Sequence, residues 1–364
     1  MRDPPVAACD CARRRAAPDD RGPRTVTRRY LITGAQGLVG RYLTARILDT
    51  EPESEVLGIG RSGSVDGFFT HAISTRGGQE RAPLPAELLA SISARHRYRS
   101  VSLLDTPGLC DLLREFRPHC VFHLASALHT ASQRDLLQTN VEGTASLMNA
   151  VADAPGLDAL VILGSSGSVY GEPEALPIRE SDTCHPADMY GLTKLAAEHV
   201  VRIHAERGGL PFVTARIFNV VGPGQSESHV CARLAAQLAS VPASRHSALE
   251  VGALDTTRDF IDVRDVAAAL LLLAQRGDGG NVYNLASGRE TPIHAILSEL
   301  LRISGLNGQV EVVRRNDRTA GVRRHVADVS RLQGLGFAPA YSIGESLCDL
   351  FRYHRAQWSD AFQR

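Results

Sequence analysis

The chain has 364 residues, 43% of them hydrophobic, so it can bury a sizeable core as one large α/β domain or two modest ones. Its 40 basic residues balance 40 acidic ones, and charge therefore favours neither nucleic acid nor an anionic membrane surface as a partner. No apolar run is longer than residues 266–274, which is far too short to cross a bilayer as a helix.

Residues 1–28 are rich in arginine and proline and lack the apolar segment of a secretory signal. We expect a disordered basic leader, with a transit-type role or a misassigned start codon as minor alternatives. The seven cysteines are scattered, and only Cys9 and Cys11 lie close together. This spacing, with no signal, predicts reduced thiols, a cytoplasmic protein and no metal site.

Strand-like and helix-like patterns alternate after the leader. Strands are expected at residues 30–33, 55–60, 99–104, 120–126, 159–166, 212–218 and 280–287. Helix-like patterns separate most of them, which predicts an α/β fold with a doubly wound parallel Rossmann sheet and ligands at the carboxyl ends of its strands. The expected domains are a cofactor-binding domain (29–221 plus about 258–288), a smaller C-terminal substrate-binding lobe (about 222–257 and 289–350) and a C-terminal tail (351–364).

A glycine-rich turn follows the first expected strand, and a helix is expected from Leu38 onward. Glycine at these points lets a pyrophosphate approach the backbone, while the helix N-terminus faces it. Three glycines alone also fit an ordinary tight turn, but the flanking strand and helix favour a dinucleotide site. The predicted contacts in this turn are Gly34, Gln36, Gly37, Leu38, Val39 and Gly40.

The second expected strand ends in Arg61 and Ser62. An acidic residue about 20 residues after the glycines would bind ribose hydroxyls and favour NAD. A guanidinium and a hydroxyl can instead hold a 2′-phosphate, which predicts a preference for NADP(H), with NAD(H) possible. The alternative is that Arg61 is a solvated loop residue or stacks on the adenine.

Of the 40 basic residues one is a lysine, Lys194, and the other 39 are arginines. Lys194 stands four residues after Tyr190 in a helix-like stretch, so both side chains lie on one face. Arginine would serve equally well on a surface, but its wide fork cannot replace a compact ammonium that reaches ribose hydroxyls and lowers the pKa of a neighbouring phenol. The pair therefore predicts a catalytic tyrosine and lysine that also contact the cofactor.

Ser165 and Ser166 end the strand expected at residues 159–166. A hydroxyl at this edge of the sheet can bind the oxygen that Tyr190 protonates or deprotonates. Alone, two serines after a strand would indicate an ordinary turn. Beside Tyr190 and Lys194, they predict a third catalytic group.

Several motifs occur in a fixed order: GAQGLVG, FHLAS, NVEGT, SSGSVYG, YGLTK, RIFNVVGPGQ and TRDFIDVRDV. In this order they resemble the extended short-chain dehydrogenase/reductases that act on nucleotide sugars, the NAD-dependent epimerase/dehydratase family. The resemblance covers roughly residues 28–350. It implies that Ser166, Tyr190 and Lys194 form the catalytic triad.

The resemblance also implies further contacts with the cofactor and the substrate. On the cofactor side these are Leu103, Leu124, Ala125, Ser126 and Asn140, of which Ala125 and Ser126 border the nicotinamide ribose and Asn140 positions the catalytic helix. On the substrate side they are Ser166, Asn219, Arg258 and Arg318. Ser102 departs from the pattern, because relatives commonly have an adenine-contacting aspartate there.

Within the family the chain most resembles the reductases of GDP-4-keto-6-deoxy-mannose. This implies an NADP(H)-dependent 4-ketoreductase of a nucleotide-activated 4-keto-6-deoxyhexose, acting as a homodimer through helices near residues 133–153 and 190–206. The alternative is a 4-epimerase with tightly bound NAD, since SSGSVYG is closer to the epimerase form of that loop. A 4,6-dehydratase is less favoured because Gly167 and Ser168 stand where dehydratases carry an acid. A dinucleotide sensor would typically lack Tyr190 or Lys194.

Overall fold

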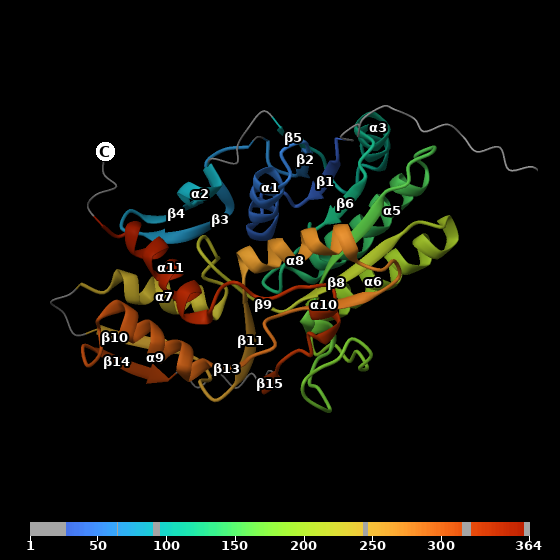
Figure 1. Cartoon of the computed structure of the whole chain (residues 1–364). Helices are drawn as coiled ribbons and strands as arrows, with labels where there is room; N and C mark the ends of the chain where they lie inside the picture. Colours follow the sequence, from blue (N-terminus) through green and yellow to red (C-terminus); the bar gives the residue numbers. More distant parts are fainter. Residues whose placement is uncertain (1–26, 64, 90–94, 243–246, 315–321, 360–364) are drawn as a thin grey trace, which may run out of the picture.

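The computed structural model of the chain describes residues 27–63, 65–89, 95–242, 247–314 and 322–359. Within them, the central sheet contains β1 (Arg29–Thr33), β2 (Glu55–Gly60), β5 (His96–Ser100), β6 (Cys120–His123), β7 (Leu160–Ser166), β8 (Phe212–Ile217) and β12 (Val282–Leu285). The strand order is β12-β8-β7-β6-β1-β2-β5, and every neighbouring pair is parallel (Figure 1). The predicted parallel α/β architecture is confirmed, and the carboxyl ends of these strands meet at one edge.

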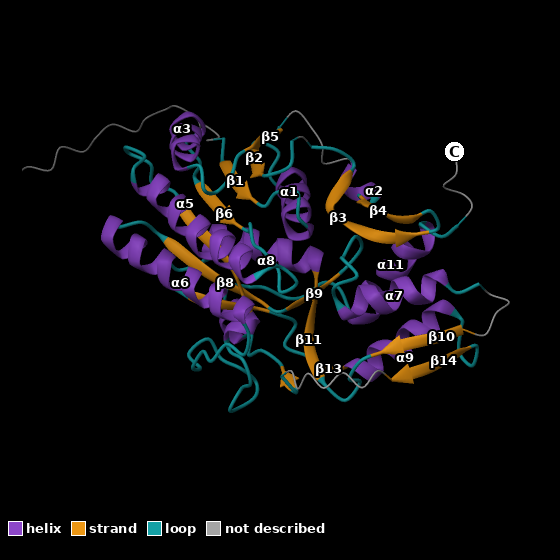
Figure 2. Cartoon of the chain, turned by 180° about the vertical axis from the view of Figure 1, so that it is seen from behind, coloured by secondary structure: helices purple, strands orange, loops and turns teal. Residues whose placement is uncertain are grey.

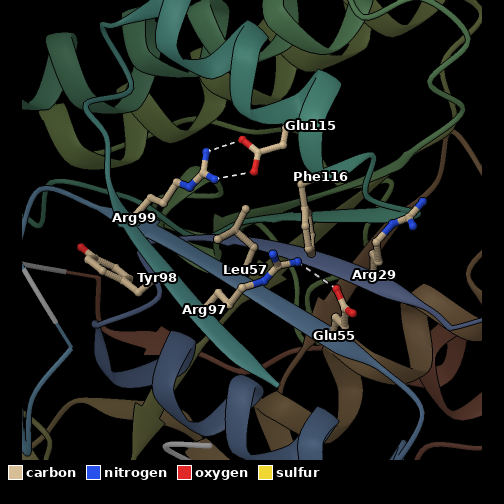
Figure 3. A pocket seen from close by; sticks show the side chains of 8 residues that line it. All are labelled: Arg29, Glu55, Leu57, Arg97, Tyr98, Arg99, Glu115 and Phe116. Carbon is tan, nitrogen blue, oxygen red and sulfur yellow. Dashed lines mark hydrogen bonds and ion pairs between the residues drawn. The ribbon is translucent and has the colours of Figure 1, made fainter. Parts of the chain in front are cut away.

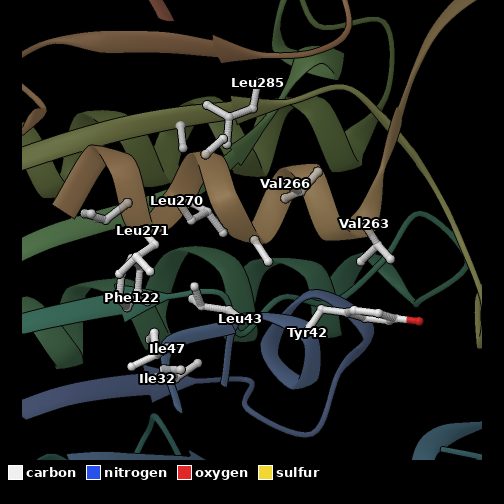
Figure 4. Close-up of a cluster of buried hydrophobic side chains, with 14 of the residues drawn as sticks. Ile32, Tyr42, Leu43, Ile47, Phe122, Val263, Val266, Leu270, Leu271 and Leu285 are labelled. Atoms are coloured by element: carbon white, nitrogen blue, oxygen red, sulfur yellow. The ribbon is translucent and has the colours of Figure 1, made fainter. Parts of the chain in front are cut away.

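Helices cover both faces of this sheet because its strands bury residues on both sides. Tyr30 and Ile32 of β1 belong to one core, whereas Leu31 belongs to the core on the opposite face. The first core is completed by α1 (Leu38–Thr50) and α8 (Val263–Arg276), and the second by α3 (Thr106–Phe116), α5 (Gly143–Ala152) and α6 (Met189–Gly208). Figure 4 shows side chains of α1 and α8 packed together over the strands.

The strand expected at residues 99–104 is misplaced, because β5 is His96–Ser100. Residues after it turn instead of extending: the Leu104 nitrogen donates to the Ser102 hydroxyl over 3.2 Å. Asp105 then caps α3 by accepting from the Gly108 nitrogen over 3.1 Å. Local hydrogen bonds of Ser and Asp thus end the strand earlier than its apolar pattern indicates.

A smaller lobe with its own hydrophobic core lies beside one end of the sheet (Figure 2). It is built from α7 (Val230–Ser240), β10 (Ser247–Val251), α9 (Ile293–Ser304), β14 (Val310–Arg314) and α11 (Ile343–Ala356). Residues 351–356, expected in a tail, form the end of α11 because Tyr353 and His354 are buried there.

A second small sheet joins the two parts of the molecule. It comprises β9 (Asn219–Val221), β11 (Thr257–Asp262), β13 (Glu290–Pro292) and β15 (Arg324–His325). The expected assignment of residues 258–288 to the cofactor domain needs correction at its start, because β11 pairs within this small sheet. In the same segment, α8 packs on the central sheet and β12 forms its edge.

The segment between β2 and β5 forms a hairpin that the sequence analysis did not anticipate. It consists of β3 (Phe68–Thr75) and β4 (Gly78–Pro83), followed by α2 (Ala86–Leu89). The Ser74 hydroxyl donates to Glu227 over 2.7 Å, and the Tyr353 hydroxyl donates to the Pro83 carbonyl oxygen over 2.8 Å. The hairpin therefore ties the end of β2 to the small lobe.

The remaining short elements are α4 (Gln133–Leu136), the π-helical turn η1 (Leu137–Glu142), the 3-10 turn η2 (Gly167–Val169) and α10 (Ser330–Gly334). Among the residues described, no helix has the length and apolar character needed to span a membrane.

Candidate active site

The loop between β1 and α1 is a tight cradle, and two of its glycine positions, Gly34 and Gly40, have no room for a side chain. Gly34 has a φ of +68°, and a Cβ there would lie 2.7 Å from the Ala125 nitrogen. A Cβ on Gly40 would collide with the Gly34 carbonyl oxygen. Gly37 is the N-cap of α1 and provides no side-chain hydrogen bond to the first turn. These features fit the pyrophosphate of a dinucleotide, which the helix N-terminus attracts.

Gln36, predicted as a cofactor contact, is only 3% exposed and bonds within the protein. Its Oε1 accepts from Arg41 Nη2 over 2.8 Å. Arg41 also donates to the carbonyl oxygens of Asp66 and Phe68, each over 3.0 Å. Leu38 and Val39 pack against the core beneath the loop. The side chains of this loop therefore hold the cradle in place beside the N-terminus of α1.

Arg61 and Ser62 follow β2 at the same edge of the sheet. The glycine loop is fastened to this strand, since the Gly34 nitrogen donates to the Ile59 carbonyl oxygen over 2.9 Å. The Ser62 carbonyl oxygen accepts from the Tyr98 hydroxyl over 3.1 Å, and the Arg61 side chain is exposed. Arg61 thus lies beside the cradle, where a residue that contacts the adenosine ribose is needed. Its contact with a 2′-phosphate stays a prediction.

Leu103 and Leu124 form apolar packing around the cradle. Leu124 lies against Gly164 of β7, where an added Cβ would be 2.9 Å from Leu124 Cδ2. Leu103 lies against Gly143, the first residue of α5, where an added Cβ would be 3.0 Å from Leu103 Cβ. The glycines thus let these leucines come close to β7 and α5.

The loop after β6 is connected to α6 through Asn140. The Ala125 nitrogen donates to Thr33 Oγ1 over 3.0 Å, and the Ser126 hydroxyl donates to Asn140 Oδ1 over 3.1 Å. Asn140 lies in η1 and donates through Nδ2 to Thr193 Oγ1 of α6 over 3.0 Å. This contact to α6 is what the predicted positioning role of Asn140 requires.

His123 at the end of β6 is a buried, uncharged side chain. Its hydrogen-bond partners determine which ring nitrogen carries the hydrogen. The Thr144 hydroxyl gives its hydrogen to the Asn140 carbonyl oxygen (2.6 Å), so His123 Nε2 must donate to Thr144 Oγ1 (2.9 Å). Nδ1 then accepts from the Thr33 hydroxyl (2.8 Å). Burial, with the charge of Lys194, lowers the pKa of His123 to about 3. The imidazole is thus a fixed structural link and not an acid or base.

The hydroxyls of Ser166 and Ser126 act on the pKa of the Tyr190 phenol. Burial raises the pKa of Tyr190 above its usual value, although hydrogen bonding to Ser166 and Ser126 acts in the opposite direction. The charge of Asp188 raises it further. That Lys194 lowers this pKa stays a prediction, because in the protein without cofactor burial sets the direction of the shift. Tyr190 keeps its proton, as a general acid must.

Lys194 lies one turn after Tyr190 on α6 and is 5% exposed. Its ammonium donates to the Gly164 carbonyl oxygen of β7 over 2.7 Å. Burial lowers the pKa of Lys194 to about 8, while the Glu198 carboxylate acts to raise it. The lysine is therefore a buried cation that still carries its charge at neutral pH, next to the cradle.

The small sheet carries two of the predicted substrate residues. Asn219 of β9 donates to the Asp259 carbonyl oxygen over 3.1 Å, and Arg258 of β11 donates to the Thr257 carbonyl oxygen over 2.7 Å. β9 and β11 are neighbouring strands, so both residues lie on the sheet that joins the two parts of the molecule. Arg318 lies outside the described residues.

His325, which the sequence analysis missed, connects Arg258 with the loop after Ser166. It is the register partner of Arg258. A Cβ added to Gly167 would lie 3.0 Å from His325 Cε1. Burial, together with the charge of Arg258, lowers the pKa of His325 to about 4. Nothing local in the sequence marks it, since only the pairing of β15 with β11 brings it here.

Glu198 and Arg216 form a second buried group that the sequence analysis missed. They are 8% and 6% exposed, and Arg216 Nη2 lies 2.8 Å from Glu198 Oε2. The sequence carries one signal for Glu198: it stands four residues after Lys194 and therefore lies on the same face of α6.

A pocket of about 410 Å³ lies at the opposite, amino edge of the sheet. Arg97 pairs with Glu55 over 2.9 Å, and Arg99 makes two hydrogen bonds with Glu115, over 2.6 and 2.7 Å (Figure 3). Two of its three arginines are paired with glutamates of its own wall, and it is lined by none of the predicted site residues. Within the described chain, no group of three or more His, Cys, Asp or Glu side chains is placed to hold a metal ion.

Comparisons with known proteins give a family match and several relatives. The model of the NAD dependent epimerase/dehydratase family matches residues 30–286. GDP-6-deoxy-D-mannose reductase of Pseudomonas aeruginosa is 33% identical over 330 residues, which cover 88% of this chain and 95% of that protein. UDP-glucose 4-epimerase of Streptomyces lividans is 30% identical, over 90% of this chain and 96% of that protein.

A solved structure extends the likeness to the fold. The structure of RMD from Pseudomonas aeruginosa complexed with NADPH superposes with a TM-score of 0.72 at 30% identity. The match covers 91% of this chain and 100% of that one.

Proposed function

The chain belongs to the NAD-dependent epimerase/dehydratase family, and from that premise we propose that it is an NADP(H)-dependent 4-ketoreductase of a nucleotide-activated 4-keto-6-deoxyhexose. The observation that carries the proposal is the grouping of Ser166, Tyr190 and Lys194 at the edge of the sheet that also holds the open glycine cradle. The likeness to a GDP-6-deoxy-D-mannose reductase supports the substrate class.

The cofactor would be held from two sides. The N-terminus of α1, where Gly37 places no side chain in front of the first turn, suits the pyrophosphate, and Arg61 suits a 2′-phosphate. The likeness to a protein solved with NADPH supports NADP(H) as a cofactor that this fold can hold. When bound, NADP(H) supplies the hydride that reduces the ketone.

The side chains of the site provide the remaining chemistry. Tyr190 gives its proton to the ketone oxygen as negative charge develops there. The Ser166 hydroxyl, which acts on the pKa of the phenol, orients that oxygen. Lys194 binds ribose hydroxyls and stabilises the phenolate that remains after the proton has left.

The loop after Ser166 argues against a 4,6-dehydratase. That reaction removes a proton from carbon 5 and expels hydroxide from carbon 6, which needs a carboxylate besides the tyrosine. Gly167 and Ser168 form η2, and the Ser168 nitrogen donates to Ser166 Oγ over 3.1 Å. Neither side chain can act as that acid or base.

A 4-epimerase is the second candidate, because UDP-glucose 4-epimerase of Streptomyces lividans is 30% identical and has a similar length. An epimerase tyrosine must first remove a proton from the substrate and later return one, whereas a reductase tyrosine only donates a proton. An epimerase would also retain NAD tightly through purification.

The test is to mix the protein with NADPH and GDP- or dTDP-4-keto-6-deoxyhexose and follow the nicotinamide absorbance. We expect NADPH oxidation and a product heavier by two hydrogens. Intact GDP-mannose and dTDP-glucose should stay unchanged. A product lighter by one water, or tightly bound NAD without NADPH oxidation, would contradict the proposal.

We also propose that two copies associate through α6 and its neighbour η1–α5. Leu192 and Ile203 of α6 are 49% and 38% exposed and stand 11 residues apart, which puts them on one side of the helix. Leu137 of η1 is 48% exposed. Light scattering should give the mass of a dimer, and Leu192→Glu should give a monomer. A monomeric wild-type protein would contradict this assembly.

A further inference from the structure

Glu198 connects the helix of the catalytic lysine to the strand of the catalytic serine. Its carboxylate accepts from the Ser165 hydroxyl, and also from Arg216 Nε and Nη2 over 3.0 and 2.8 Å. Ser165 directly precedes Ser166 on β7. Arg216 is the register partner of Ser165 on β8. Glu198 lies one turn after Lys194. Its side chain therefore fixes α6, which carries the catalytic lysine, to β7, which carries the catalytic serine.

Arg216 is itself held from the other side, so the carboxylate has a rigid partner. Its Nη1 donates to the Glu180 carbonyl oxygen over 3.3 Å, and its guanidinium carbon lies 4.7 Å from the centre of the Tyr170 ring. The Tyr170 hydroxyl donates to Asn284 Oδ1 of β12 over 2.7 Å. A shift of α6 would therefore break contacts that extend to the edge of the sheet.

Glu198 is also the anionic group that acts on Lys194. The groups around that ammonium are the Gly164 carbonyl oxygen on β7, the neutral imidazole of His123 on β6 and the protonated Tyr190 on its own helix. Only Glu198 among them carries negative charge, and its effect opposes that of burial. Arg216 of β8 pairs with this carboxylate, but only Glu198 of the two acts on the pKa of Lys194.

We propose that Glu198 is a positioning residue with two effects: it sets the distance between Lys194 and Ser166, and it keeps the Lys194 ammonium charged in a buried site. The effect on Lys194 follows from the position of the Glu198 carboxylate, one helical turn after the lysine, and from its charge. The effect on turnover rests on the proposed function.

The variants separate charge from packing. Glu198→Gln keeps the size of the side chain but leaves Arg216 buried without its carboxylate, and it can fail to fold. The double variant Glu198→Gln/Arg216→Met removes both charges and keeps a packed core. Ser165→Ala removes one hydrogen bond and no charge. Glu206→Gln is the matched control, because Glu206 pairs with Arg202 on the same helix but is 58% exposed.

The single lysine allows a direct readout that needs no substrate. Lysine labelled with carbon-13 at the ε position gives one side-chain resonance in this chain, and its shift with pH reports the titration of Lys194. The double variant should titrate lower than the wild type by about one pH unit, because the nearest negative charge is gone. Glu206→Gln and Ser165→Ala should match the wild type. An unchanged titration in the double variant would overturn the charge effect.

Kinetics with the 4-keto sugar nucleotide test the positioning effect. In the double variant the alkaline fall of kcat should move to lower pH together with the lysine titration. Ser165→Ala should lower kcat about tenfold at constant KM, with an unchanged pH profile. Wild-type kcat in both variants would overturn the positioning effect. If the wild type reduced none of these ketones, the proposed function would be wrong. The carbon-13 titration of Lys194 would still decide whether Glu198 keeps the ammonium charged.

Discussion

Lys194 and Arg216 are buried cations on either side of Glu198, with 5% and 6% of their surface exposed, yet they are bonded very differently. Arg216 donates twice to the Glu198 carboxylate and once to the Glu180 carbonyl oxygen. Lys194 donates to the neutral Gly164 carbonyl oxygen. One cation is therefore matched by a carboxylate in bidentate geometry, and the other is held by a backbone dipole.

Their pKa values move in opposite directions. For Arg216 burial acts to lower the pKa, but the hydrogen bonds and charge of Glu198 raise it overall. For Lys194 burial dominates, and the pKa falls to about 8. A buried charge without a bidentate partner costs stability, so Lys194 is retained for chemistry, whereas Arg216 is retained for the architecture around it.

The largest expected effect is on turnover. Tyr190→Phe removes the proton that Lys194 helps to deliver, and kcat should fall by about 10²- to 10⁴-fold. NADPH affinity, measured by fluorescence titration, should stay nearly unchanged because the ring remains. Tyr353→Phe is the control, since that hydroxyl bonds to Pro83 in the hairpin. Activity above a tenth of wild type would remove Tyr190 from the mechanism.

The next effect is on stability and concerns Arg216. Arg216→Met leaves the Glu198 carboxylate buried without its partner, and the free energy of unfolding should fall by about 3–5 kcal/mol. Adding Glu198→Gln should restore most of that loss, since no buried charge is then left unpaired. Urea denaturation followed by circular dichroism measures both. Equal stability of the single and double variants would show that the pair is not coupled.

Lys194→Met should change the free energy of unfolding in the opposite direction to Arg216→Met, and by a smaller amount. Removing a cation that burial disfavours should raise the free energy of unfolding by about 1–3 kcal/mol at pH 7. Between the folded pKa of about 8 and the usual lysine pKa of 10.5, the unfolded chain binds more protons, so wild-type stability rises with pH relative to the variant. The difference in free energy of unfolding between Lys194→Met and the wild type should therefore become smaller toward pH 10. A less stable variant would mean that Lys194 holds the fold together.

Arg61 gives the smallest expected effect and extends the comparison to an exposed arginine. Arg61→Asp should shift the ratio of kcat/KM values for NADPH and NADH toward NADH by about tenfold, because the carboxylate repels a 2′-phosphate. The free energy of unfolding should not change, in contrast to Arg216→Met. Unchanged selectivity would show that Arg61 does not contact the phosphate.

The central sheet could be predicted from the sequence because its signals are local. Gly34, Gly37 and Gly40 mark the turn, and apolar periodicity marks α1 and most strands. The hairpin β3–β4 has no such signal. Its Phe69 is buried beside Gly224, about 150 residues later in the chain, and only the folded structure brings the two together. Periodicity cannot detect burial of this kind.

The site divides in the same way. Tyr190 and Lys194 are four residues apart on one helix, so their spacing alone predicts that they act together. Glu198 continues the same spacing, but its partner Arg216 lies on β8 and could be found only from the strand register. The direction of the Tyr190 pKa was also out of reach, since burial determines it and burial depends on the whole fold.

The most direct test of why this chain keeps one lysine is Lys194→Arg, which preserves the charge and changes its shape. Arginine's fork fits neither the contact with the Gly164 carbonyl oxygen nor the space of a compact ammonium, so kcat for NADPH-dependent reduction should fall about 100-fold or more. The folded structure, followed by circular dichroism, should persist. Near-normal kcat in Lys194→Arg would contradict the account, because any buried cation would then serve beside Tyr190.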